Sequence, residues 1–188
     1  MTWSSLQADT DSRRFVFIDE SGAKTNMTRL RGRAFGGKRC HDHAPGGHWN
    51  TTTMISSIRL DGEVACMAIK GATTGRVFRE YIRTILAPTL RPGDIVVADN
   101  LSAHKDKQAQ ELIRQAGAEF WWLPAYSPDL NPIEQMWSKV KESLRSAKAR
   151  TQEALYAAIA AALDLITPEN ARGWFKACGY SQLNCKVL

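Results

Sequence analysis

The sequence lacks the features that mark secreted and membrane proteins. Its first fifteen residues have no apolar core and carry acids, so they do not form a signal peptide. The longest apolar-rich run, residues 154–166, is interrupted by Asp164 and is too short to span a bilayer. Four scattered cysteines, none in a CxxC pair, are typical of free thiols in a reducing compartment. These absences predict a protein of the cytoplasm or nucleoid, without a membrane partner.

Little in the sequence argues for more than one domain. The chain has 188 residues, with no internal repeat and no low-complexity segment. A chain of this length buries about 70% of its unfolded surface, so it needs no disulfide or metal to fold. Hydrophobic residues make up 44% and charged residues 23%, which excludes a disordered or fibrous chain. The net charge of +6 is compatible with a polyanionic partner but does not establish one.

The order of apolar segments predicts an α/β fold. Short apolar or β-rich runs predict strands at residues 15–18, 51–60, 63–70, 94–99 and 119–123. Helical spacing predicts helices at residues 77–85, 109–116, 132–144, 151–166 and 168–178. Asp61-Gly62 predicts a hairpin between the second and third strands. The sheet is therefore expected to be mixed and five-stranded, with its first three strands antiparallel and helices on its faces.

Two acids follow strands in the same way. Asp19 and Asp99 each stand at the carboxyl end of an apolar strand. If these strands are neighbours, both carboxylates lie at the sheet edge where α/β proteins bind ligands. The alternative is that each acid only ends a strand at a turn. Two matched instances favour a functional role.

Glu134 is the third acid, in the first turn of the helix that begins at Asn131-Pro132. At about 100° per residue, it falls on the flank of that helix's apolar stripe. The alternative role is a capping box, in which Glu134 reaches back to the Asn131 amide. Three converging carboxylates would repel one another, and divalent cations with oxygen ligands are the usual compensation.

The three acids lie within motifs that resemble the catalytic core of DDE transposases. The motifs are FIDESG at residues 17–22, VADN at 97–100 with His104, and LPAYSPDLNPIE at 123–134 with Trp137. Between the second and third acids lie 34 residues, a spacing similar to that family. The branch it resembles is the bacterial insertion-sequence group related to mariner elements (the "six-thirty" type). The SPDLNPIE string is the specific part of the match.

The resemblance implies a ribonuclease-H-like catalytic domain at residues 15–180, with a short leader at 1–14 and a tail at 181–188. It implies metal-dependent DNA cleavage at transposon ends and strand transfer into target DNA. The three acids would hold two Mg²⁺ ions, with Mn²⁺ as a substitute, and Asp19 would bridge both. No covalent protein–DNA intermediate is needed, so no Ser or Tyr nucleophile is expected.

Other residues are assigned supporting roles. Asn100, His104 and Asn131 would orient the metal site or touch a phosphate, although a turn or a helix start would also explain them. Glu20 would point to the face opposite Asp19 if the strand continues, and is left out of the metal set. A set of basic residues would contact DNA phosphates, with a solvated basic face as the alternative. They are Lys24, Arg29, Arg31, Arg33, Lys38, Arg39, Lys139 and Lys141.

One loop holds metal-ligand residue types without the spacing of a zinc site. It contains Cys40, His41, Asp42, His43 and, further on, His48. A structural zinc site usually takes four Cys or His ligands at CxxC or HxxxH-like spacing. A loop near DNA or the active site is therefore favoured.

Two other functions stay open. A stand-alone nuclease of the same fold is disfavoured by the SPDLNPIE string, and a catalytically silent transposase remnant by the presence of all three acids. The expected partners are terminal inverted repeats and target DNA, bound by a homodimer or a larger assembly. Because Asp19 comes so early, the chain is expected to be a catalytic part alone, from a split reading frame or a truncated copy. A separately encoded helix-turn-helix protein would then recognise the transposon ends.

Overall fold

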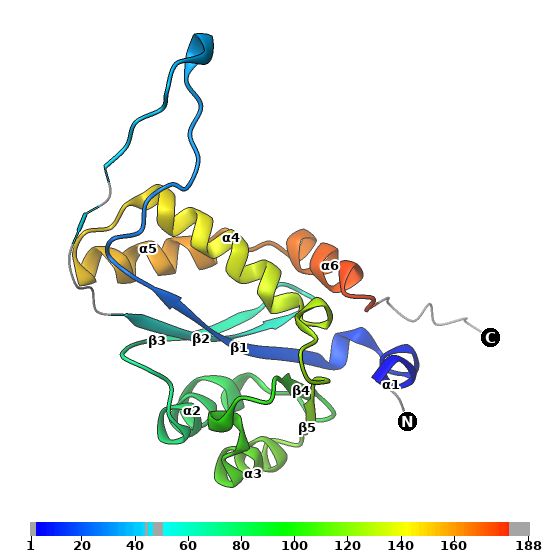
Figure 1. The fold of residues 1–188 in the computed structure, drawn as a ribbon. Helices are drawn as coiled ribbons and strands as arrows, with labels where there is room; N and C mark the ends of the chain where they lie inside the picture. The colour runs from blue at the N-terminus through cyan, green and yellow to red at the C-terminus, as the bar shows by residue number, and fades with distance from the viewer. Residues whose placement is uncertain (1–2, 44, 47–50, 181–188) are drawn as a thin grey trace.

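A mixed five-stranded sheet forms the centre of the molecule (Figure 1). The computed structural model describes residues 3–43, 45–46 and 51–180, so the predicted tail at 181–188 and His48 lie outside it. The strands are β1 (Phe15–Ala23), β2 (Thr52–Arg59), β3 (Val64–Lys70), β4 (Ile95–Ala98) and β5 (Glu119–Trp122). Their order is β3-β2-β1-β4-β5. The first three strands are antiparallel neighbours, and β4 and β5 run parallel to β1, which confirms the predicted fold class.

Helices cover both faces of the sheet. They are α1 (Trp3–Asp9), α2 (Gly75–Tyr81), α3 (Lys107–Gln115), α4 (Pro132–Ala147), α5 (Gln152–Asp164) and α6 (Pro168–Ala177). Helices α4, α5 and α6 lie on one face, and α2 and α3 on the other (Figure 1). After α2 the chain continues through a π-helical turn, Ile82–Leu86. No helix in the described part of the chain is long and apolar enough to cross a membrane.

Alternate residues of β1 belong to different cores. Phe15 and Phe17 pack with α4, α5 and α6, whereas Val16 and Ile18 pack with α2 and α3. The prediction that this strand ends at Asp19 is wrong, because β1 stays paired with β2 as far as Ala23. Continued alternation places Asp19 on the α4 face and the next residue on the α2 face.

Helix α1 lies within the predicted leader, where no helix is expected from the sequence. It is held by contacts with distant residues. The Trp3 ring meets Trp121 edge-on at 6.2 Å, and Gln7 Nε2 donates a hydrogen bond to the carbonyl of Cys178 at 2.9 Å. Residues 3–9 are therefore packed against the rest of the chain.

Between β1 and β2 the chain forms an arm, residues 24–43, which extends away from the sheet past α4 and α5 (Figure 1). Residues 29–43 of this arm are exposed. Its base is fastened to the chain after α4, where Arg150 Nη1 donates to the carbonyls of Thr25 at 2.9 Å and Met27 at 3.0 Å. An ion pair of 2.5 Å between Lys148 and Asp42 joins the returning side of the arm to the end of α4.

Candidate active site

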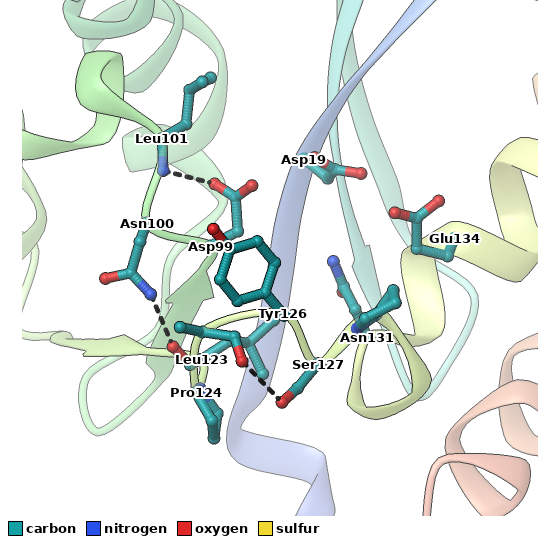
Figure 2. Close-up of a pocket in the computed structure, with 12 residues that line it drawn as sticks. Asp19, Asp99, Asn100, Leu101, Leu123, Pro124, Tyr126, Ser127, Asn131 and Glu134 are labelled. Atoms are coloured by element: carbon teal, nitrogen blue, oxygen red, sulfur yellow. Dashed lines mark hydrogen bonds between the residues drawn. The ribbon is translucent and has the colours of Figure 1, made fainter.

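One pocket of about 430 Å³ is lined by Asp19, Asp99 and Glu134 (Figure 2). The three acids come from separate segments: β1, the residue after β4, and the first turn of α4. Figure 2 shows Asp19 between Asp99 and Glu134. The structure therefore brings together the three acids that the sequence predicts to converge.

The register of two parallel strands places the first two acids at one edge of the sheet. Phe17 of β1 pairs with Val97 of β4, and each acid follows two residues later. Burial, together with the neighbouring carboxylates of Glu134, Glu20 and Asp99, raises the pKa of Asp19 to about 7. The pocket thus concentrates negative charge that a bound cation would offset.

The start of α4 leaves two polar side chains available to the pocket. Asn131 occupies the N-cap position, but its side chain makes no cap hydrogen bond with the residues that the structure describes. Its backbone N–H instead donates to the carbonyl of Pro128 at 3.0 Å. Its Oδ1 is buried and has no partner in the described chain. The capping-box alternative is therefore wrong, and Figure 2 shows Asn131 and Glu134 beside Asp19.

Asp99 is held by neighbours on the far side of the pocket. Its Oδ1 accepts hydrogen bonds from the backbone N–H of Leu101 at 2.9 Å and lies 2.8 Å from Nδ1 of His104. The hydrogen bond with His104 lowers the pKa of Asp99. Burial lowers the pKa of His104, but its hydrogen bonds with Asp99 and Glu20 outweigh this and raise it to about 10.

Asn100 has a structural contact of its own. Its Nδ2 donates to the carbonyl of Leu123 at 2.9 Å, which joins the end of β4 to the loop after β5 (Figure 2). In that loop Tyr126 has a left-handed backbone, with φ of 57°, and a fully exposed ring at the front of the pocket. The sequence offered no signal for this exposure, because Tyr126 stands in a loop without periodicity.

The three acids that line the pocket offer carboxylate oxygens, which are ligands that fit a hard divalent cation. No three Asp, Glu, His or Cys side chains of the described residues are grouped closely enough to hold one ion. The acids instead face one another across the pocket.

The predicted DNA-contacting residues fall into two groups. Lys24, Arg29, Arg31, Arg33, Lys38 and Arg39 lie on the arm, and all six are exposed. On α4, Lys139 is used within the molecule, because its Nζ lies 2.5 Å from both the carbonyl of Leu165 and Oδ1 of Asn170. Lys141 is half-buried on the same helix.

The Cys40 loop belongs to the returning side of the arm. Asp42 accepts the ion pair from Lys148, which lowers the pKa of Asp42, and Cys40 is exposed. None of the described residues of this loop belongs to a group that could hold a metal ion. The fifth residue, His48, lies outside the described residues.

A mixed sheet with antiparallel strands on one side, parallel strands on the other and acids at its carboxyl edge defines a ribonuclease-H-like domain. Residues 14–156 match the family model described as DDE superfamily endonuclease, so the chain belongs to that family.

Solved structures of Mos1 transposase share this fold. A paired-end complex with the left transposon end superposes with a TM-score of 0.73 at 16% identity, covering 96% of this chain and 59% of that one. The catalytic domain of Mos1 mariner transposase superposes with a TM-score of 0.65 at 13% identity, covering 94% of this chain and 84% of that one.

A curated relative is the Tcb2 transposase of a transposable element in Caenorhabditis briggsae. It is 33% identical over 73 residues, which is 35% of this chain and 27% of the relative. The chain therefore matches about a quarter of that relative and under two thirds of the Mos1 chain in the paired-end complex.

Proposed function

We propose that this chain is the catalytic domain or subunit of a DNA transposase, which cleaves DNA at transposon ends and joins those ends to target DNA. One observation carries the proposal: Asp19, Asp99 and Glu134 converge on one pocket in a chain of the DDE superfamily endonuclease family. The relatives support it, since both Tcb2 and Mos1 are transposases, and one Mos1 structure is a strand transfer complex.

The three acids would hold two Mg²⁺ ions, with Mn²⁺ as a substitute. Figure 2 shows Asp19 between Asp99 and Glu134. Asp19 would therefore be a ligand of both ions, and Asp99 and Glu134 would each be a ligand of one. Mos1 structures with Mg and with Mn support this choice of ions. When bound, such ions supply Lewis-acid activation of a water or a 3′-hydroxyl for in-line attack on a phosphodiester.

The proposal also covers the family branch, the location, the substrates and the partners of the enzyme. On the motifs of the pocket, we propose that the enzyme belongs to the bacterial insertion-sequence group related to mariner elements and acts at the nucleoid in the cytoplasm. Terminal inverted repeats and target DNA are the proposed substrates. Two ends must be held together for cut-and-paste transposition, so a homodimer or larger assembly on DNA is proposed. A separately encoded helix-turn-helix protein would supply recognition of the end sequence.

The test is a cleavage and strand-transfer assay on labelled DNA that carries the inverted repeats flanking the coding region. We expect products only with Mg²⁺ or Mn²⁺. Asp99→Ala should reduce them by at least about a hundredfold, since even residues that only support a metal ligand affect activity by about 10–100-fold. DNA binding, measured by a mobility shift without divalent ions, should be retained.

The assay also separates the two alternatives. A stand-alone nuclease would degrade an RNA–DNA hybrid and leave the transposon ends intact. A silent remnant would bind DNA but form no product, and Asp99→Ala would then equal the unaltered chain. Either result would contradict the proposed transposase activity.

A further inference from the structure

A chain of three side chains leads from the buried His104 and Glu20 inside the domain to the half-exposed Asp99 at the pocket. His104 is fully buried, and its Nε2 lies 3.0 Å from Oε2 and 3.1 Å from Oε1 of Glu20. Its Nδ1 lies 2.8 Å from Oδ1 of Asp99. Glu20 is not among the residues that line the pocket, whereas Asp99 is. The imidazole therefore joins a carboxylate outside the pocket to one inside it.

The sheet explains why these groups meet. Alternation along β1 turns Glu20 to the face opposite Asp19, where α2 and α3 pack. His104 lies on the same face, in the 3₁₀ helix Ser102–Lys105, and its ring lies 4.6 Å from the ring of Phe78 in α2. Nδ1 also lies 3.2 Å from the backbone carbonyl of Asp99. Because carbonyls and ionised carboxylates only accept hydrogen bonds, both ring nitrogens act as donors. The ring is thus fixed on three sides.

The contacts with Leu101 and His104 hold only one of the two carboxylate oxygens of Asp99. Among the described residues, all side-chain hydrogen bonds of Asp99 go to Oδ1, from the backbone N–H of Leu101 and from His104. Oδ2 makes none, and in Figure 2 the second oxygen of Asp99 is turned toward Asp19. A carboxylate whose first oxygen is held by two donors cannot rotate freely, so its second oxygen keeps a constant direction.

We propose that Glu20 and His104 are positioning residues that lock Asp99 so that its free Oδ2 is presented to a divalent cation in the pocket. The inference rests on the proposed function, in which Asp99 is a metal ligand. It assigns Glu20 a role outside the metal set, through His104. It also explains why a buried imidazole and carboxylate stand next to the carboxyl edge of the sheet, where an apolar pair would fold at lower cost.

The test measures Mn²⁺ binding directly, by the loss of the electron paramagnetic resonance signal of free Mn²⁺ as the full chain is added. An Asn side chain can place its N–H near the position of Nδ1, and a Gln side chain near that of Nε2. We expect His104→Gln and Glu20→Ala to weaken Mn²⁺ binding about tenfold. His104→Asn, which keeps a donor for Asp99, and Glu20→Gln, which keeps an acceptor for the ring, should retain most of the affinity.

A matched control separates positioning from stability. Asp106 forms a 2.6 Å ion pair with Arg79 outside the pocket and caps α3. Asp106→Asn should lower the melting temperature and leave Mn²⁺ affinity unchanged. If it weakens Mn²⁺ binding as much as Glu20→Ala does, or if His104→Gln and His104→Asn bind equally, the positioning role is overturned. Unaltered Mn²⁺ binding in both His104→Gln and Glu20→Ala overturns it as well.

The same experiment distinguishes this inference from the proposed function. Asp99→Asn should reduce both Mn²⁺ binding and strand transfer, whether or not Glu20 and His104 position Asp99. Loss of activity in Asp99→Asn with normal behaviour of the Glu20 and His104 variants would leave the transposase proposal intact and refute the positioning role. Should His104→Gln fail to fold by circular dichroism, the comparison of Glu20→Ala with Glu20→Gln decides the outcome.

Discussion

At the scale of single residues, the ionised carboxylate of Asp19 lowers the stability of the fold. Its pKa is raised to about 7 by burial and by the neighbouring carboxylates. A carboxyl group that ionises less readily in the folded chain than in the unfolded chain destabilises the fold progressively as pH rises from about 4 to about 7. The destabilisation of the fold is constant above this pH range and absent below it. This behaviour is expected of a group whose charge is meant to be neutralised by a ligand.

We therefore predict that Asp19→Asn raises the free energy of unfolding at pH 8 in divalent-free buffer. The gain is at most about 4 kcal/mol, because one pKa unit corresponds to about 1.4 kcal/mol. This difference in the free energy of unfolding should vanish near pH 4. Added Mg²⁺ should reduce the difference, because Mg²⁺ stabilises only the unaltered chain. Urea unfolding at both pH values measures this. Asp164→Asn, an exposed substitution on α5, serves as the control, and equal stabilities of Asp19→Asn and the unaltered chain at pH 8 would contradict the prediction.

The sequence predicts the three acids because Asp19 and Asp99 directly follow short apolar runs and Glu134 stands in the first turn of a helix. It could not predict the contact between Glu20 and His104, which are 84 positions apart and meet because β4, shortly before His104, pairs with β1. The local capping pattern at Asn131 was misleading for a related reason. Local spacing permits a capping box, but the chain before α4 turns so that the Asn131 N–H meets Pro128 instead.

At the scale of elements, all five strands are predictable from short apolar runs and one Asp-Gly turn. The extension of β1 and helix α1 could not be predicted, because both depend on distant partners. The extension of β1 pairs with β2, and α1 is held by Trp121 and Cys178. The Asp-Gly turn itself does more than reverse the chain. Gly62 has a φ of +86°, and a Cβ placed there would lie 2.9 Å from the backbone nitrogen of Pro168 at the start of α6.

Gly62→Ala should therefore destabilise the fold by about 1–3 kcal/mol, through backbone strain and through displacement of α6. Gly71→Ala is the matched control, because Gly71 also has a positive φ, +98°, but a Cβ there meets no atom of the described residues within 4 Å. It should show the strain alone, about 1 kcal/mol. Urea midpoints measure both variants. Equal midpoints would mean that the hairpin turn does not contribute to holding α6.

At the scale of the whole molecule, α4 links the pocket to the arm. Its first turn carries Glu134, and the base of the arm is fastened to its other end. With 16 residues at about 1.5 Å each, the helix is about 24 Å long. A DNA backbone that enters the pocket and follows α4 would reach the arm after roughly seven base pairs, at 3.4 Å per base pair. In the proposed transposase, the arm would therefore contact DNA well away from the phosphodiester that is cleaved.

This placement predicts how binding depends on salt. Alanine at Arg31, Arg33, Lys38 and Arg39 should weaken binding to duplex DNA irrespective of sequence, and each lost phosphate contact should reduce the slope of log K against log salt by about 0.9. Fluorescence anisotropy over a salt series measures it. Arg114→Ala, on α3 across the sheet, removes an exposed positive charge without touching the arm and should leave the slope unchanged. If the fourfold variant keeps the slope of the unaltered chain, the arm does not lie on DNA and its positive charge must serve another contact.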